Sequence, residues 1–96
     1  MKLEIGKIPN DLLEKLLAFC SEPQRKEVMS RPMVGEDCAL IDFKNDICVV
    51  TTDPITGSDD EIGILGVNIA CNDLASAGAE PVGLLVTVLA PPGTEF

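Results

Sequence analysis

The longest apolar run of this chain extends from Pro81 to Pro92, and it limits what the chain can fold into. The run is too short to span a bilayer, which takes about 20 apolar residues, and it carries three prolines. Residues 82–90 are apolar almost throughout, which is typical of a strand covered on both faces. The sequence therefore predicts a core strand over 82–90.

A strand of this kind needs more cover than the chain readily supplies. The 96 residues make one domain, and 46% of them are hydrophobic. A domain this short buries only about 60% of the surface of its unfolded chain. We expect a partner subunit or a second domain as the cover. The sequence stops at 94–96, directly after a Pro-Pro-Gly segment, so we expect a truncated chain that lacks a further domain.

The first half of the chain predicts a helix followed by a hairpin. Residues 9–20 place leucines at helical spacing, with Asn10 as the expected cap. Residues 21–35 are polar and punctuated by proline, which predicts a loop, with a short helical turn possible at 23–29. Strands are expected at 38–43 and 47–52, joined by a turn at 44–46.

The second half predicts a loop, a long helix and the core strand. The loop at 53–60 begins with Asp53 and contains Gly57, Ser58, Asp59 and Asp60, and the helix at 61–77 is closed by Gly78. The order helix, hairpin, helix, strand predicts an α+β fold, with a mixed or antiparallel sheet covered by helices on one face. Within it, residues 1–34 form a helical N-terminal segment and loop, and residues 35–96 form the core.

Charge and composition exclude several classes of function. The net charge is −9, so binding of nucleic acid or of an anionic membrane is not expected. A nucleotide would need a divalent cation to bridge its phosphates to the carboxylates. The chain has no histidine, which removes the usual general base and zinc ligand. Its chemistry must then rest on carboxylates, amides, backbone groups and a bound metal.

The spacing of the cysteines and the sequence of the amino terminus predict where in the cell the protein is located. Four cysteines stand at irregular spacing and predict reduced, mostly buried side chains rather than disulfides; they are Cys20, Cys38, Cys48 and Cys71. The first residues, 1–4, lack the apolar core of a signal peptide. We therefore expect a cytoplasmic protein.

Asp73 is the most informative single residue. It projects from a largely apolar face of the predicted helix, near the carboxyl end, where the helix dipole disfavours negative charge. A carboxylate there needs a cation or hydrogen-bond donors. A structural hydrogen bond or a surface position explains it as readily as a metal ligand does. The neighbouring stripe of Asn68, Asn72 and Ser76 is more simply a polar ribbon on a solvated helix.

Two further aspartates stand beside the predicted strands. Asp37 leads into the first strand and Asp53 ends the second. Separately, each has an ordinary explanation, a capping carboxylate and an Asp-Pro turn. Together with Asp73 they suggest a site for a hard cation, since Mg²⁺ prefers oxygen ligands. Lys7 is a possible phosphate contact, although a solvated lysine is the simpler explanation.

Three segments resemble the motifs of one superfamily. Gly35–Ile41 (GEDCALI) resembles a G-[DE]-D-A-A-hydrophobic motif, with Cys38 in place of the usual alanine. Thr51–Gly57 (TTDPITG) looks like a strand-end T-x-D motif, and Asn72–Pro81 (NDLASAGAEP) is similar to a helix signature, N-D-[LIV]-A-x-x-G-A-x-P. The superfamily contains aminoimidazole-ribonucleotide (AIR) synthetase, thiamine-monophosphate kinase, selenophosphate synthetase and the hydrogenase-maturation dehydratase. The residues Asp53–Gly57 (DPITG) of the second motif most resemble those of a branch near the dehydratase.

The resemblance implies a fold, an assembly and a reaction. It implies an N-terminal ATP-binding domain that is followed by a larger α/β domain, and two copies whose sheets pair into a barrel-like homodimer. It implies that Asp37, Asp53 and Asp73 bind Mg²⁺ or order the triphosphate of ATP, with Asn72 in support. A substrate oxygen would attack the γ-phosphate, giving ADP. The 96 residues alone would then have little turnover.

Two alternative hypotheses of function are compatible with the same sequence. The domain could be a non-catalytic dimerisation module that kept the fold, because the apolar strands 47–52 and 82–90 need an external cover. A metal-binding module that uses the cysteines is disfavoured by their irregular spacing.

Overall fold

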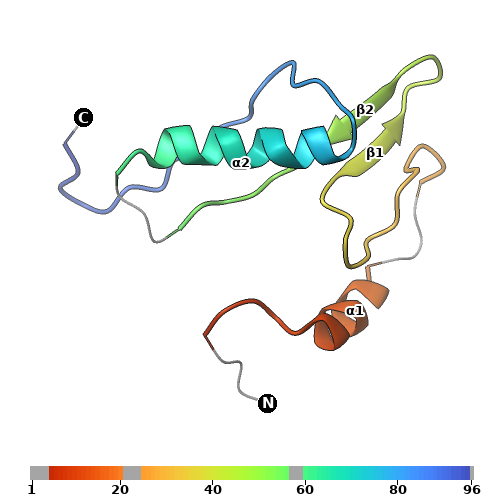
Figure 1. The fold of residues 1–96 in the computed structure, drawn as a ribbon, viewed down its shortest axis with the longest axis horizontal. Helices are drawn as coiled ribbons and strands as arrows, with labels where there is room; N and C mark the ends of the chain where they lie inside the picture. Colours follow the sequence, from red (N-terminus) through yellow and green to blue (C-terminus); the bar gives the residue numbers. More distant parts are fainter. Residues whose placement is uncertain (1–4, 21–24, 57–59, 96) are drawn as a thin grey trace.

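Two helices and one hairpin make up the regular structure of the part of the chain that is described (Figure 1). The computed structural model describes residues 5–20, 25–56 and 60–95. Along the chain the elements are α1 (Asn10–Ala18), β1 (Ala39–Asp42), β2 (Ile47–Val50) and α2 (Ile62–Ser76). The strands form a two-stranded antiparallel sheet. This confirms the predicted α+β class.

Helix α1 begins one residue later than expected and uses a different start. Asn10 is the first helical residue rather than the cap, and Pro9 precedes the helix without a side-chain hydrogen bond. The carbonyl of Pro9 accepts the amides of Leu12 and Leu13, at 3.1 and 2.9 Å. Proline has no backbone N–H, but its carbonyl oxygen can still accept the first hydrogen bonds of a helix. In Figure 1, α1 lies apart from α2 and from both strands. The predicted layer of helices over one face of the sheet stays a prediction.

The hairpin forms within the two segments, 38–43 and 47–52, that are expected to be strands. Ala39 pairs with Val50 and Asp42 pairs with Ile47. In the turn, the carboxylate of Asp42 accepts the amide of Lys44 at 2.7 Å, which stabilises the positive φ of 74° at that lysine. Strand β1 lacks the first and the last residue of the predicted range 38–43, and β2 lacks the last two residues of the predicted range 47–52.

A segment that the sequence analysis assigned to a loop pairs with the other edge of β1. Val28 forms an isolated antiparallel bridge with Ile41. The amide of Met29 donates to the carbonyl of Leu40 at 2.9 Å, and the amide of Asp42 donates to the carbonyl of Glu27 at 2.7 Å. The possible helical turn at 23–29 is confirmed only as one turn in its described part, where the amide of Val28 donates to the carbonyl of Arg25 at 3.0 Å. It does not continue as a helix, because Val28 and Met29 pair with β1 instead. Residues 21–24 lie outside the described residues.

Helix α2 closes as the sequence predicted. Gly78 has a φ of +71°, a left-handed conformation that glycine adopts at little cost. Its amide donates to the carbonyl of Ala75 at 2.9 Å, and the amide of Ala79 donates to that of Leu74 at 2.9 Å. At the other end, Glu61 is left-handed and precedes the first helical residue. The part of the predicted loop that contains Gly57, Ser58 and Asp59 lies outside the described residues.

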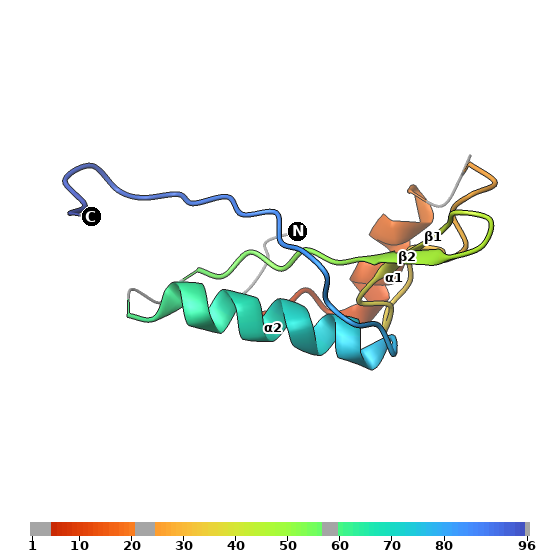
Figure 2. The ribbon, with the colours of Figure 1, turned by 90° about the horizontal axis from the view of Figure 1, so that it is seen from above.

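An extended segment, 51–56, runs beside α2 for much of the length of the helix, as the two views in Figures 1 and 2 show. Ile55 lies beside the helix at Gly66, where its Cγ1 atom is 3.8 Å from the position that a Cβ would occupy. The chain thus leaves β2, follows α2 towards its amino end, and returns through the helix. This path brings the carboxyl end of α2 back to the hairpin.

The third strand predicted at 82–90 is wrong for this structure. Residues 79–90 continue from α2 without strand pairing, and a turn follows, in which the amide of Thr94 donates to the carbonyl of Pro91 at 3.3 Å. Val82, Leu85 and Leu89 are 99%, 102% and 93% exposed. A strand requires a hydrogen-bonded neighbour, and none of the described segments lies in register beside this one. The apolar pattern identified residues that need cover, but the neighbouring strand is missing.

Burial is slight throughout the described part of the chain. Cys38 is the one buried hydrophobic residue there. The radius of gyration is 16.1 Å, against about 12.5 Å for a compact domain of this length. Within the described ranges, no helix is both long enough and apolar enough to cross a membrane. The apolar faces that the sequence predicts as core therefore face solvent in this single copy.

Candidate functional site

The start of β1, the end of β2 and the carboxyl end of α2 meet at one place, which we call the acidic junction. It consists of Glu36, Asp37, Cys38, Thr51 and Asp73, joined by hydrogen bonds and by their electrostatic effect on Cys38. In Figure 1 the last turn of α2 reaches the ends of both strands. Two of the predicted site residues, Asp37 and Asp73, belong to this junction.

Strand register explains why Thr51 lies at the centre. Ala39 pairs with Val50, so continuing the antiparallel register by one residue places Thr51 opposite Cys38. The Thr51 hydroxyl lies 2.9 Å from the backbone carbonyl of Asp37 and 3.3 Å from the carboxylate Oδ2 of Asp73. A hydroxyl has one proton to donate, so it is shared between these two acceptors. Thr51 thereby connects the first and third motifs of the chain.

Asp73 is also held by its backbone. Its carbonyl accepts the Cys38 thiol, with Sγ at 3.2 Å, and the Ser76 hydroxyl at 2.7 Å. The last carbonyls of a helix lack intrahelical donors, so these side chains supply partners at the end of α2. The partly buried Asp73 is consequently fixed in position by two hydrogen bonds to its backbone and one to its carboxylate.

Cys38 reports the negative charge of the junction. Burial raises the pKa of the Cys38 thiol above its ordinary value. The nearby charges of Asp73, Asp37 and Glu36 raise this pKa in the same direction. A hydrogen bond with Thr51 opposes these effects in part. The thiol therefore stays protonated and acts as a hydrogen-bond donor rather than as a nucleophile.

Two shallow hollows flank the segment from Glu36 to Cys38. The first, of about 270 Å³, is lined by this segment together with Gly35, Leu40 and the end of α2 at Ser76 and Ala77. The second, of about 380 Å³, lies on the side of the hairpin that also carries Thr51 and Thr52. Both open widely to solvent. The backbone before β1 thus lines both hollows.

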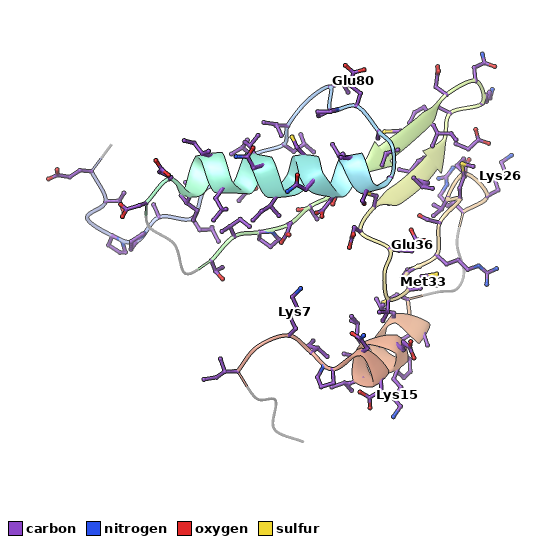
Figure 3. All side chains as sticks on the ribbon, viewed as in Figure 1. Lys7, Lys15, Lys26, Met33, Glu36 and Glu80 are labelled. Atoms are coloured by element: carbon purple, nitrogen blue, oxygen red, sulfur yellow. The ribbon has the colours of Figure 1, made fainter. Side chains whose placement is uncertain are left out.

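The other predicted site residues lie outside the junction. Asp53 and Asn72 are exposed, and no hydrogen bond in the described part joins either of them to the junction. Lys7 is exposed as well; Figure 3 shows it on the segment before α1, well apart from Glu36. The structure therefore brings together two of the three predicted aspartates, and leaves Asp53 apart two residues beyond Thr51.

A complete cation cage is not preformed. Among residues 5–20, 25–56 and 60–95, no three acidic or cysteine side chains are grouped closely enough to hold a metal ion. The donors present at the junction are carboxylate, hydroxyl and carbonyl oxygens, which suit a hard cation. The one ion pair found in the described ranges, Arg25 with Glu27, lies away from the junction, and neither residue belongs to it.

Sequence reasoning overlooked Thr51 and Glu36 as site residues. In the sequence Thr51 is one residue of the second motif, and its role follows from Cys38, the residue opposite it directly before β1. Glu36 is one residue of the first motif, and nothing else in the sequence distinguishes it. The strand register of the hairpin was the signal that would have identified Thr51, because Cys38 and Thr51 follow directly from the pairing of Ala39 with Val50.

Comparison with protein families decides the assignment. The model for "AIR synthase related protein, N-terminal domain" matches residues 35–96, more than half of the chain.

The chain belongs to this AIR synthase related family.

The match begins at Gly35, where the first of the three motifs begins, and it includes every residue of the acidic junction. It confirms the superfamily that the motifs indicated. Comparison with curated proteins and with solved structures gives no significant match.

Proposed function

We propose that this AIR synthase related chain is the Mg-ATP-binding part of a phosphoryl-transfer enzyme. The proposal rests mainly on one observation, the hydrogen bond that joins the carboxylate of Asp73 to the Thr51 hydroxyl and so to the Asp37 backbone. Two acidic motifs of the family, 35 residues apart along the chain at Cys38 and Asp73, are thereby held at one place. An arrangement of this kind suits the binding of a cation and its attached phosphates.

The donor set is compatible with magnesium. Mg²⁺ is commonly held by one or two carboxylates, while substrate phosphates and waters complete its octahedral shell. Asp37 and Asp73 supply two carboxylates from separate elements, and all other polar groups of the junction except the thiol offer oxygen. The net charge of −9 also requires a cation between the protein and a triphosphate.

The roles follow from this placement. Asp73, held at the end of α2, and Asp37, before β1, would hold the cation; Asp53 would join them from the segment after β2, with Asn72 in support. Bound Mg²⁺ would neutralise charge that develops on the transferred phosphoryl group. The reaction proposed is attack of a substrate oxygen on the γ-phosphate of ATP, which leaves ADP. A role in hydrogenase maturation follows from the likeness of the second motif to the dehydratase branch.

The exposed apolar side chains of the proposed enzyme need a cover that a single copy of this chain does not provide. A homodimer formed through the hairpin sheet, together with an α/β domain on the C-terminal side, would cover the exposed side chains of β2 and of residues 82–89. The same exposure also supports the second candidate function, a scaffold that dimerises without catalysis.

Calorimetric titration separates the two functions. The full-length product of the gene that encodes this chain is titrated with ATP in the presence of Mg²⁺, and again with excess chelator. We expect saturable heat only with Mg²⁺, followed by formation of ADP when the acceptor substrate is supplied. Sedimentation as a dimer with no heat of Mg-ATP binding would establish the scaffold and defeat the enzyme proposal.

A further inference from the structure

We propose that Thr51 is a positioning residue, whose hydroxyl sets the carboxylate of Asp73 against the backbone before β1. This inference rests on the proposed function and deepens it, because Asp73 is one of the two junction carboxylates proposed to hold the cation. Thr51 itself would touch neither the cation nor the nucleotide.

The geometry carries this assignment. The hydroxyl of Thr51 is the one side-chain group that reaches both the Asp37 carbonyl, at 2.9 Å, and the Asp73 carboxylate, at 3.3 Å, among the contacts found in the described residues. The Thr51 side chain is partly buried, so water replaces these bonds less readily than on an open surface.

The position of Asp73 explains why such a bond is needed. The carboxylate stands near the carboxyl end of α2, where the helix dipole disfavours negative charge. Without a donor, the aspartate would turn towards solvent. Groups that hydrogen-bond a ligating carboxylate fix its direction, and their loss commonly weakens metal binding about tenfold or more.

Three variants of the full-length protein test this inference. Thr51→Val removes the hydroxyl and keeps the shape, whereas Thr51→Ser keeps the hydroxyl. Thr94→Val is the matched control: it removes the same group from a similar bond, 2.8 Å to the carbonyl of Pro91, away from the junction. Each variant is first compared with the wild type by thermal melting, so that a loss of folding is recognised.

The first readout requires no nucleotide. Hydrogen exchange measured by mass spectrometry follows the amides at 38–40 and at 77–79, on the two sides of the junction. Thr51→Val should speed exchange at both places, while Thr51→Ser and Thr94→Val should exchange as the wild type does. Wild-type exchange in Thr51→Val overturns the inference, whatever the protein binds.

The second readout is the Mg²⁺ concentration that gives half-maximal ATP binding. Thr51→Val should raise this concentration about tenfold, and Thr51→Ser should restore it. If the wild type binds Mg-ATP and Thr51→Val requires no more Mg²⁺, the positioning role is wrong. If the wild type binds no Mg-ATP while exchange still increases in Thr51→Val, the bridging role of Thr51 stands and the proposed function fails.

Discussion

The hydroxyl of Thr51 lies 3.3 Å from the carboxylate Oδ2 of Asp73, which is 22 residues further along the chain. This contact joins the end of β2 to the carboxyl end of α2. The Cys38 thiol, directly before β1, donates to the Asp73 carbonyl at 3.2 Å and so joins the start of β1 to the same end of α2. Cys38 is also the one buried hydrophobic residue of the described part of the chain.

Asp73→Asn tests the carboxylate most directly. Asparagine keeps an oxygen that can accept from Thr51 but removes the charge, so the fold should persist while Mg-ATP binding weakens at least about tenfold. Calorimetry of the full-length protein measures the change. Asp46→Asn, in the hairpin turn, is the control, since Asp46 is exposed and lies outside the junction. Equal affinity in Asp73→Asn and wild type would remove Asp73 from the site.

Asp53→Asn asks whether a third carboxylate joins the first two. Asp53 is exposed and apart from the junction here, so its substitution should leave the melting temperature unchanged. We nevertheless expect phosphoryl transfer to fall at least about tenfold, because ligands on loops often close only around the bound cation and phosphates. Steady-state rates at saturating Mg²⁺ provide the measurement. An unchanged rate would show that two aspartates are sufficient.

The Cys38 thiol should be the least reactive of the four. Burial and neighbouring negative charge raise the pKa of Cys38, and only the thiolate reacts readily. At pH 8, alkylation followed by peptide mass spectrometry should label Cys38 at least about tenfold more slowly than the exposed Cys20 and Cys48. Denaturation in urea should abolish the difference. Equal rates in the folded protein would contradict the burial of Cys38.

The same raised pKa predicts a loss of stability at alkaline pH. The pKa of the Cys38 thiol is higher in the folded than in the unfolded protein, where it is about 8.5. The resulting contribution to stability is fully present below the unfolded pKa. It is lost as the pH rises through the folded pKa. Urea unfolding from pH 7 to pH 10 should show this decline in the wild type and in Cys48→Ala. The decline should be smaller in Cys38→Ala; if it is not, another group causes it.

Two glycine substitutions in and after α2 should act with opposite signs. Gly78→Ala places a side chain at a φ of +71° and should lower the free energy of unfolding by about 1 kcal/mol. Gly63→Ala lies within the helix, where no atom of the described residues outside its own helical turn is within 4 Å of the added Cβ, and should raise it by about 0.5–1 kcal/mol. Chemical denaturation of the full-length variants measures both. A stabilising Gly78→Ala would exclude the left-handed helix end.

Sequence alone determined the local structure and the family. Helical spacing of leucines predicted α1, two short apolar runs separated by a polar turn predicted the hairpin, and Gly78 marked the end of α2, because each is a short-range preference of backbone and side chain. Three motifs in the right order led to the AIR synthase related family, which the family match confirms. The position of Asp73 near the end of a helix could likewise be predicted from the sequence.

Only the tertiary structure decided which of those residues meet. The role of Thr51 depends on the register of β1 with β2 and on the return of α2 to the hairpin, and the pairing of Met29 with Leu40 depends on a free strand edge. The strand predicted at 82–90 is wrong because its formation also depends on the tertiary structure. An apolar pattern specifies that a segment needs cover, but hydrogen bonding to a neighbour in three dimensions decides whether it becomes a strand.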